Sequence, residues 1–376
     1  MILENDYTHF SILTIKENNM AKIKAAVIFG GTSREHKLSL ASAAEVIRNI
    51  PKDKYELTCI GITRKGRWLY FPGDVEDIPT GEWELDPDCT SAIISPDPLN
   101  RGLIVIENGE AVVRRLDVVF PVVMGKHGAD GTIQGLLDLS GIPYVGSGVL
   151  AAASCMDKSH IHMVMDDHGI DTAEWRIITQ SELNDIDGRC EEIAGELGFP
   201  LIVKPAKSGT SAGTSKADDL EQFIAAVKVA FSNDNKVVVE KYVKARKMEV
   251  AVFGYDSPFS SYVGEIFDTD KVYDPTEVKT TGNDNLRVPA DIPDEIQAKM
   301  RETAVKAFKA MCCKGMARID FLLTEDNRIL LNKIVTAPGL RRNSVFPTLM
   351  DNIGISHEDC VDMLLEQAID NFERTY

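Results

Sequence analysis

The stretch from Lys24 to Ile62 constrains the fold most, because it encodes a strand, a glycine turn, a helix and a second strand. Val27-Ile28-Phe29 is an apolar run that ends in Gly30-Gly31. Apolar residues on one face predict a helix over residues 39–50, and Tyr55–Ile62 predicts the next strand. A further apolar run at residues 117–123 predicts another strand. This succession is typical of an α/β layer built on a parallel sheet.

Charge and composition exclude two broad classes of protein. The 376 residues carry 58 acidic and 41 basic side chains, a net charge of −17, which argues against duplex nucleic acid as a partner. No apolar run approaches the roughly 20 residues that span a bilayer, so we expect no membrane segment. Seven scattered cysteines without metal-ligand spacing favour a reducing, cytoplasmic location.

The rest of the chain alternates predicted strands and helices. We expect residues 1–19 to be a disordered extension, residues 64–116 to hold a hairpin insertion, and residues 249–290 to be antiparallel with a loop at 268–286. The other predicted strands are 175–178, 201–204, 236–240, 317–323 and 328–334, and the predicted helices are 159–168, an acidic one ending at Leu197, and 295–311. Between strands 201–204 and 236–240 we expect only a glycine-containing turn.

That turn carries the first chemical signal. Lys204 stands at the end of a strand and is followed by a run of small residues up to Gly213. Small residues let backbone N–H groups approach an anion and a lysine adds a point charge, so a triphosphate is the expected ligand. The alternative, a tight flexible loop without a ligand, is equally compatible with this segment alone.

Arg318 and Asp320 carry the second signal, because alternate residues of a strand point to one face. A carboxylate there suits a metal ion, and a guanidinium suits a developing oxyanion. The alternative is a surface strand with a salt-bridged face. The histidines show no ligand spacing and are interpreted as packed or exposed side chains.

In order along residues 22–370, the motifs resemble the D-alanine–D-alanine ligase family, within the ATP-grasp superfamily and near its D-Ala–D-Ser and D-Ala–D-lactate ligases of vancomycin resistance. The matching segments are Val27–Gly31, Glu35–Leu40, Asp130–Gly135, Gly141–Gly148, Met156–Lys158, Val203–Pro205, Arg318–Asp320 and Pro338-Gly339. The resemblance implies an α/β ATP-grasp fold of three domains, at residues 20–149, 150–238 and 239–376, with the lid loop at 268–286 in the third.

The resemblance also implies ATP, magnesium and D-amino acids as ligands, a homodimer, and a role in making peptidoglycan precursors through an acyl phosphate. Phosphate-binding positions match Lys158, Lys204, Thr210 and Ser211, with Thr210 counted among the catalytic residues. The adenine hinge matches Glu240, Lys241 and Val243. Arg318 and the N–H of Gly339 match the oxyanion stabilisers, Asp320 a magnesium ligand, and Ser344 with Val345 the acceptor-carboxylate clamp.

Eight contact positions depart from the family pattern. Where the family has an Asn-Glu-Ile-Asn strand with two metal ligands, this chain has Lys333 and Val335. The remaining substituted positions are Lys37 (substrate ammonium), Lys247 (ribose), Met124 and Ala129 (a His-Gly…Glu-Asp-Gly segment), and Val278 and Lys279 (lid). Because magnesium requires oxygen ligands, the leading hypothesis is a ligase-family protein with impaired catalysis. The alternatives are an active ligase with shifted substrates and a non-catalytic nucleotide-binding protein.

Overall fold

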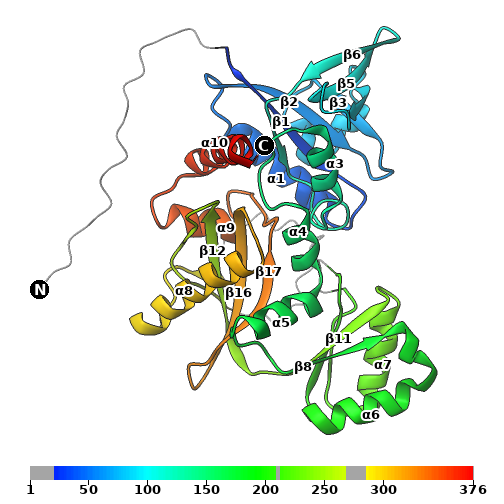
Figure 1. Cartoon of the computed structure of the whole chain (residues 1–376), viewed down its shortest axis with the longest axis vertical. Helices are drawn as coiled ribbons and strands as arrows, with labels where there is room; N and C mark the ends of the chain where they lie inside the picture. Colours follow the sequence, from blue (N-terminus) through cyan, green and yellow to red (C-terminus); the bar gives the residue numbers. More distant parts are fainter. Residues whose placement is uncertain (1–20, 209–211, 268–284, 376) are drawn as a thin grey trace, which may run out of the picture.

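The computed structural model describes residues 21–208, 212–267 and 285–375 and builds them into three sheets with helices on their faces (Figure 1). A seven-stranded sheet has the strand order β6-β5-β4-β3-β2-β1-β7. Only β1 pairs in parallel with both neighbours, β2 and β7, and the outer pairs are antiparallel. The bounds are β1 (Ile23–Gly30), β2 (Tyr55–Ile62), β3 (Trp68–Phe71), β4 (Thr90–Ile94), β5 (Gly102–Glu107), β6 (Glu110–Arg115) and β7 (Val118–Pro121).

The parallel core is thus confirmed, but the hairpin predicted for residues 64–116 underestimates the number of strands in this segment. Instead of a hairpin inserted beside the sheet, this segment extends the sheet by four strands, of which only β5 and β6 form a tight hairpin. Between β3 and β4 lie α2 (Asp77–Thr80) and the 3₁₀ turn η1 (Glu82–Leu85). The polar, turn-rich composition concealed these elements because the strands are short and several face solvent on one side.

Trp83 shows why the insertion is part of the core. Its indole is fully buried and lies edge-on to Phe29, at a centroid distance of 5.1 Å, and to Phe71, at 6.2 Å. Gly61 leaves the room for it, since a Cβ there would stand 2.1 Å from the ring. A four-residue turn therefore anchors the antiparallel half of the sheet to the parallel half.

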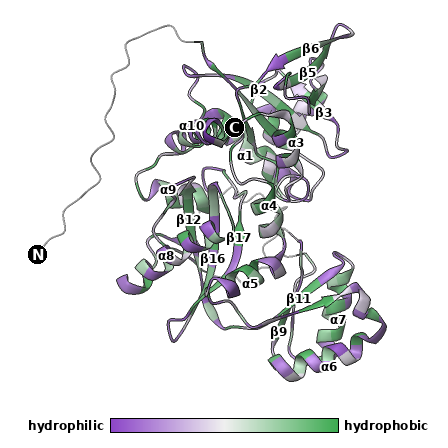
Figure 2. Ribbon diagram, viewed as in Figure 1, coloured by the Kyte–Doolittle hydropathy of each residue, from purple (hydrophilic) through white to green (hydrophobic). Residues whose placement is uncertain are grey.

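Helices cover both faces of this sheet because successive β1 side chains alternate between them. Val27 and Phe29 pack with α1 (His36–Arg48) and α10 (His357–Thr375), whereas Ala26 and Ile28 pack with α3 (Thr132–Ser140). The hydropathy colouring shows α10 with one apolar and one polar side (Figure 2).

Helix α10 returns from the far end of the sequence to the first sheet. Asp362 accepts hydrogen bonds from Lys54 Nζ, at 2.7 Å, and from the Tyr55 hydroxyl, at 2.7 Å. Below these polar contacts the buried side chains of Cys360 and Leu364 join the same apolar cluster as β1.

The second sheet is four-stranded and antiparallel, in the order β10-β9-β11-β8. Two helices pack on it through a common apolar cluster. Its elements are β8 (Trp175–Thr179), the 3₁₀ turn η2 (Gln180–Asp185), α6 (Ile186–Leu197), β9 (Leu201–Pro205), β10 (Ser215–Ala217), α7 (Leu220–Phe231) and β11 (Lys236–Lys241). The predicted simple turn between β9 and β11 was wrong, because it also holds β10 and α7.

The third sheet runs β15-β14-β12-β16-β17, with β13 paired to β12. Three helices, α4, α5 and α8, pack against it. The bounds are α4 (Val149–Met156), α5 (Lys158–Asp167), β12 (Ala245–Gly254), β13 (Phe259–Ser260), β14 (Gly264–Ile266), β15 (Leu286–Arg287), α8 (Asp294–Ala310), β16 (Gly315–Thr324), β17 (Ile329–Val335) and α9 (Val345–Asp351). Within the described ranges, no helix has the length and apolar character needed to cross a membrane.

We predict that Trp83→Ala lowers the free energy of unfolding by about 3–5 kcal/mol, because a large aromatic side chain leaves a cavity between two halves of one sheet. Urea titration followed by far-UV circular dichroism measures this. Leu85→Ala is the matched control in the same turn: Leu85 is 82% exposed, so its truncation should change stability by less than about 0.5 kcal/mol. Equal effects of the two substitutions would contradict the anchoring role of Trp83.

Candidate active site

Three ionisable side chains lie in a row across the third sheet. Strand register places Glu249 of β12 opposite Asp320 of β16, and Asp320 opposite Lys333 of β17. Directly opposed residues share a face, so two carboxylates and one amine stand side by side. A register shift after Asp320 leaves Asn332 as an extra residue on β17. The bulge lets both Asn332 and Lys333 contribute to the region between the sheets.

Arg318 binds both carboxylates of this row. Its Nε and Nη2 donate to the two Asp320 oxygens at 2.7 and 2.8 Å, and its Nε lies 3.0 Å from Glu249 Oε2. The fork geometry of guanidinium suits such bidentate pairing. The Arg318–Asp320 ion pair is the contact that the alternative interpretation, a salt-bridged strand face, expected, but the pair is partly buried and not on an open surface.

Burial raises the pKa of Glu249 to about 7, with a further upward contribution from the Asp320 carboxylate, while Arg318 and Lys333 lower it. Sequence analysis did not single out Glu249. The sequence offered one signal for it: Glu249 is a carboxylate that directly precedes the apolar run Val250–Phe253. Its proximity to Asp320 depends on sheet pairing between segments about 70 residues apart.

Lys333 lies within this group of charges. Burial lowers its pKa, Asp320, Glu35 and Glu249 oppose that shift, and Arg318 reinforces it. Glu35 comes from the turn before α1, so the first sheet supplies a carboxylate to a site on the third. Burial raises the pKa of Glu35, and Lys333 opposes this. We name Glu35, Glu249, Arg318, Asp320 and Lys333 the charge cluster.

Two further lysines adjoin the charge cluster, Lys158 at the start of α5 and Lys204 on β9 of the second sheet. Lys158 Nζ donates to the carbonyl oxygens of Ser208, at 2.8 Å, and Pro205, at 3.2 Å. Burial lowers the pKa of Lys158 to about 7, and the positive charges of Lys333 and Lys204 lower it further, against the carboxylates of Glu240 and Asp157. Lys158, Lys204 and Lys333 thus act on one another electrostatically; we call them the lysine triad.

Lys204 connects the second and third sheets. Its Nζ donates to Glu240 Oε2 at 2.6 Å and to Asn332 Oδ1, next to Lys333, at 3.4 Å. Glu240 is itself buried and 3.1 Å from His162 Nε2. Burial alone would raise the pKa of Glu240, but Lys204 and His162 outweigh it and bring the pKa to about 2. An ionised, buried Glu240 therefore fixes the position of Lys204.

His162 extends this network to the surface. Its Nδ1 is 2.9 Å from the Thr172 hydroxyl, and its ring stacks on Trp175 with a centroid distance of 4.9 Å. The histidine is buried, as sequence analysis expected of packed histidines, but its contact with Glu240 was not foreseen. The reason is that helix α5 and strand β11 are about 80 residues apart in sequence.

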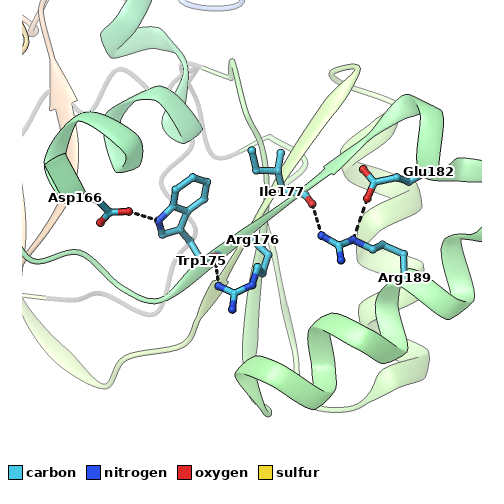
Figure 3. Close-up of a pocket in the computed structure, with 6 residues that line it drawn as sticks. All are labelled: Asp166, Trp175, Arg176, Ile177, Glu182 and Arg189. Carbon is cyan, nitrogen blue, oxygen red and sulfur yellow. Dashed lines mark hydrogen bonds and ion pairs between the residues drawn. The ribbon is translucent and has the colours of Figure 1, made fainter.

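Figure 3 shows the surface hollow that Trp175 borders. The side chains that line it pair with one another: Trp175 Nε1 donates to Asp166 at 3.1 Å, and Arg189 Nε lies 2.9 Å from Glu182 Oε1. Arg176 Nη1 donates to the backbone oxygen of Trp175 at 2.7 Å. These mutual contacts make the hollow a poorer candidate for chemistry than the lysine triad and the charge cluster.

The remaining predicted contact residues lie in two places. Lys241 ends β11, with its ammonium bound to the backbone oxygen of Leu197, and half-buried Val243 lies between β11 and β12. Ser344 and Val345 stand at the start of α9, where a Cβ on Gly339 would be 3.1 Å from Ser344 Oγ. Their roles as adenine hinge, oxyanion donor and acceptor clamp stay predictions.

The substituted positions divide by burial. Met124 is buried, with its carbonyl oxygen accepting from Ser33 Oγ at 2.7 Å, and Ala129 is half-buried nearby. Val335 lies opposite Arg318. Lys37 and Lys247, by contrast, are exposed. From the α1 segment it is Glu35 that interacts with the charge cluster, and the substrate-ammonium position assigned to Lys37 stays a prediction.

Four predicted site residues, Thr210, Ser211, Val278 and Lys279, lie outside the described residues, as does most of the predicted lid loop at 268–286. Of the last residues of the predicted loop, Leu286 is described and belongs to strand β15. The disordered extension predicted for residues 1–19 also falls outside.

The residues around Asp320 do not fit a magnesium ion. Both Asp320 oxygens are occupied by Arg318, and the residue opposite is an amine where an oxygen ligand is required. Among residues 21–208, 212–267 and 285–375, no cluster of three or more His, Cys, Asp or Glu side chains is arranged to hold a metal. A carboxylate whose two oxygens accept hydrogen bonds from a guanidinium, with an amine opposite it, is a weak donor set for magnesium.

Comparison with known proteins agrees with this architecture. Residues 24–147 match the family described as D-ala D-ala ligase N-terminus, and residues 164–366 match D-ala D-ala ligase C-terminus. The D-alanine–D-alanine ligase of Acetivibrio thermocellus is 38% identical, covering 93% of this chain and 97% of the relative. That of a Thermoanaerobacter species is 40% identical, covering 94% and 98%.

Solved structures give the same answer. The VanG D-Ala:D-Ser ligase of Enterococcus faecalis superposes with a TM-score of 0.84 at 33% identity, covering 93% of this chain and all of that one, 100%. The D-alanine–D-alanine ligase of Coxiella burnetii gives 0.81 at 29% identity, covering 94% and 97%. The fold is that of the ATP-grasp ligases. Within that class, the chain belongs to the D-alanine–D-alanine ligase family, as the motifs predicted.

We predict that anion binding at the lysine triad weakens as pH rises through about 7. Lys158 has a pKa of about 7 in the free protein, and a bound polyanion favours its ammonium form, so binding above that pH must take up a proton. Relative to the Lys158→Met variant, which retains only the ionisation of the ligand, tripolyphosphate affinity measured by calorimetry should fall about tenfold between pH 6 and pH 8. Lys158→Met should bind more weakly and lose most of this slope. A slope unchanged by the substitution would contradict the assignment.

Proposed function

We propose that the chain binds ATP between the second and third sheets and a D-alanine-type substrate beside the charge cluster, as a ligase-family protein of peptidoglycan precursor synthesis. The observation that carries this proposal is the convergence of Lys158, Lys204 and Lys333 from three separate elements. Three cations in one partly buried region match the charge of a triphosphate. The names of the relatives supply the substrate class, and a homodimer in the cytoplasm is part of the proposal on the family resemblance alone.

The contacts around the triad support a division of labour. Glu240, Lys241 and the backbone at Val243 lie at the edge of the second sheet, where an adenine would stack against the strand–loop junction. Lys158 and Lys204 bind phosphate oxygens, with Thr210 and Ser211 of the small-residue loop as further donors. Arg318 and the Gly339 N–H stabilise negative charge on the substrate carboxyl group, and Ser344 with Val345 bind the acceptor.

We further propose that ligation through an acyl phosphate is impaired in this chain. A positive charge about 4 Å from a divalent cation opposes metal binding by several kcal/mol even at an effective dielectric constant of about 20. Lys333 and Val335 also remove two oxygen ligands from the site. An active ligase with shifted substrates would use Lys333 to bind a substrate carboxylate. This alternative is less well supported, because the carboxylates of Asp320, Glu35 and Glu249 already compensate the positive charge of Lys333.

The test is ADP formation with ATP, magnesium and D-alanine, alone or paired with D-serine or D-lactate. Since about 1.4 kcal/mol corresponds to a tenfold change in rate, we expect turnover at least about 100-fold below that of a relative such as the Acetivibrio ligase. The double substitution Lys333→Glu with Val335→Asn should raise turnover, because it restores two oxygen ligands beside Asp320. Lys306→Glu, on the exposed side of α8, is the charge-matched control and should change nothing.

Turnover of the unaltered chain equal to that of the relative would overturn the impairment. ADP formation confined to a different amino-acid or hydroxy-acid pair would instead support the shifted-substrate alternative. If the chain binds no nucleotide at all, the proposal of an ATP site is wrong.

A further inference from the structure

The position of Lys333 calls for an explanation beyond the loss of a metal ligand. A buried amine is costly to charge, and natural cores place such groups only where partners compensate. Here the partners are provided: Asp320, Glu35 and Glu249 all favour the ammonium form. The three carboxylates come from three different segments, so the cluster is assembled by the tertiary fold around this one side chain.

Lys333 also faces the proposed nucleotide site. Its electrostatic effect on Lys158 is the largest that any charged residue exerts on that lysine. Its neighbour Asn332 accepts from Lys204 Nζ at 3.4 Å. Lys333 therefore stands on β17 of the third sheet, near Lys204 of the second sheet and Lys158 at the start of α5. A polyphosphate bound by Lys158 and Lys204 would meet Lys333 from the opposite side.

From this geometry we propose that Lys333 contacts the nucleotide phosphates directly and serves as a resident cation in place of a divalent metal ion, so that nucleotide binding does not require metal. This inference rests on the proposed ATP site. Arg318 and Lys333 share the carboxylates of Asp320 and Glu249, and of these two cations it is Lys333 whose charge acts on Lys158 of the proposed nucleotide site. The bulge at Asn332 accommodates the arrangement.

The experiment is calorimetric titration of the full chain with AMP-PNP, an ATP analogue that is not hydrolysed, in EDTA and in excess magnesium. The native protein should bind in EDTA with an affinity within about threefold of that in magnesium. Lys333→Met keeps the aliphatic stem and removes the charge, and should weaken binding in EDTA by about tenfold. Lys306→Met, at an exposed lysine of α8, is the matched control and should bind as the native chain does.

Lys333→Glu gives the sharpest contrast. It should abolish binding in EDTA and make it magnesium-dependent, because a further carboxylate beside Asp320 and Glu249 needs a cation. Circular dichroism of each variant verifies the fold, and the methionine variant decides the matter if the glutamate variant does not fold. Native binding that tightens more than tenfold with magnesium, or metal-free binding unaffected by Lys333→Met, overturns the inference alone. No binding by native protein in either buffer overturns the proposed ATP site.

Discussion

The ion pairing of Arg318 with Asp320 and Glu249 is the interaction on which the rest of the site depends. These three side chains come from adjacent strands of one sheet, where two carboxylates side by side would repel each other. The guanidinium fork at 2.7–3.0 Å offsets that repulsion and fixes both carboxylates. The two carboxylates, together with Glu35, then compensate the charge of the buried amine of Lys333. Without Arg318 the row would have to draw in an external cation.

Charge compensation also explains how three sheets share one site. The carboxylate of Glu35, in the turn after β1, is compensated by Lys333 of the third sheet, and Lys204 of the second sheet donates a hydrogen bond to Asn332 of the third. Within the second sheet, the buried pair of Glu240 and Lys204 is complete in itself and positions an ammonium at the sheet's edge. Because removing one partner of such a buried pair leaves the other charge uncompensated, changes in this region act on placement as well as on binding.

Sequence patterns predicted the parallel core and the helices α1, α5, α6 and α8, because these depend on apolar periodicity, and they placed Arg318 and Asp320 on one strand face, because the two are two residues apart. They missed Trp83, whose burial depends on Gly61 of another strand, and Glu249, whose partner is set by sheet register. They also assigned a substrate-facing role to Lys37, which is exposed, whereas Glu35 faces the cluster. Glu35 precedes helix α1 and Lys37 lies in its first turn, so their side chains point in different directions. A sequence motif does not specify these directions.

The return of α10 to the first sheet has a consequence for synthesis in the cell. A chain emerging from the ribosome completes β1 and β2 early, but Asp362, the partner of Lys54 and Tyr55, is translated some 300 residues later. Until then this face of the parallel core is covered by α1 but lacks the apolar side chains of α10. The first sheet therefore gains its full set of native contacts only when the last residues of the chain have been translated.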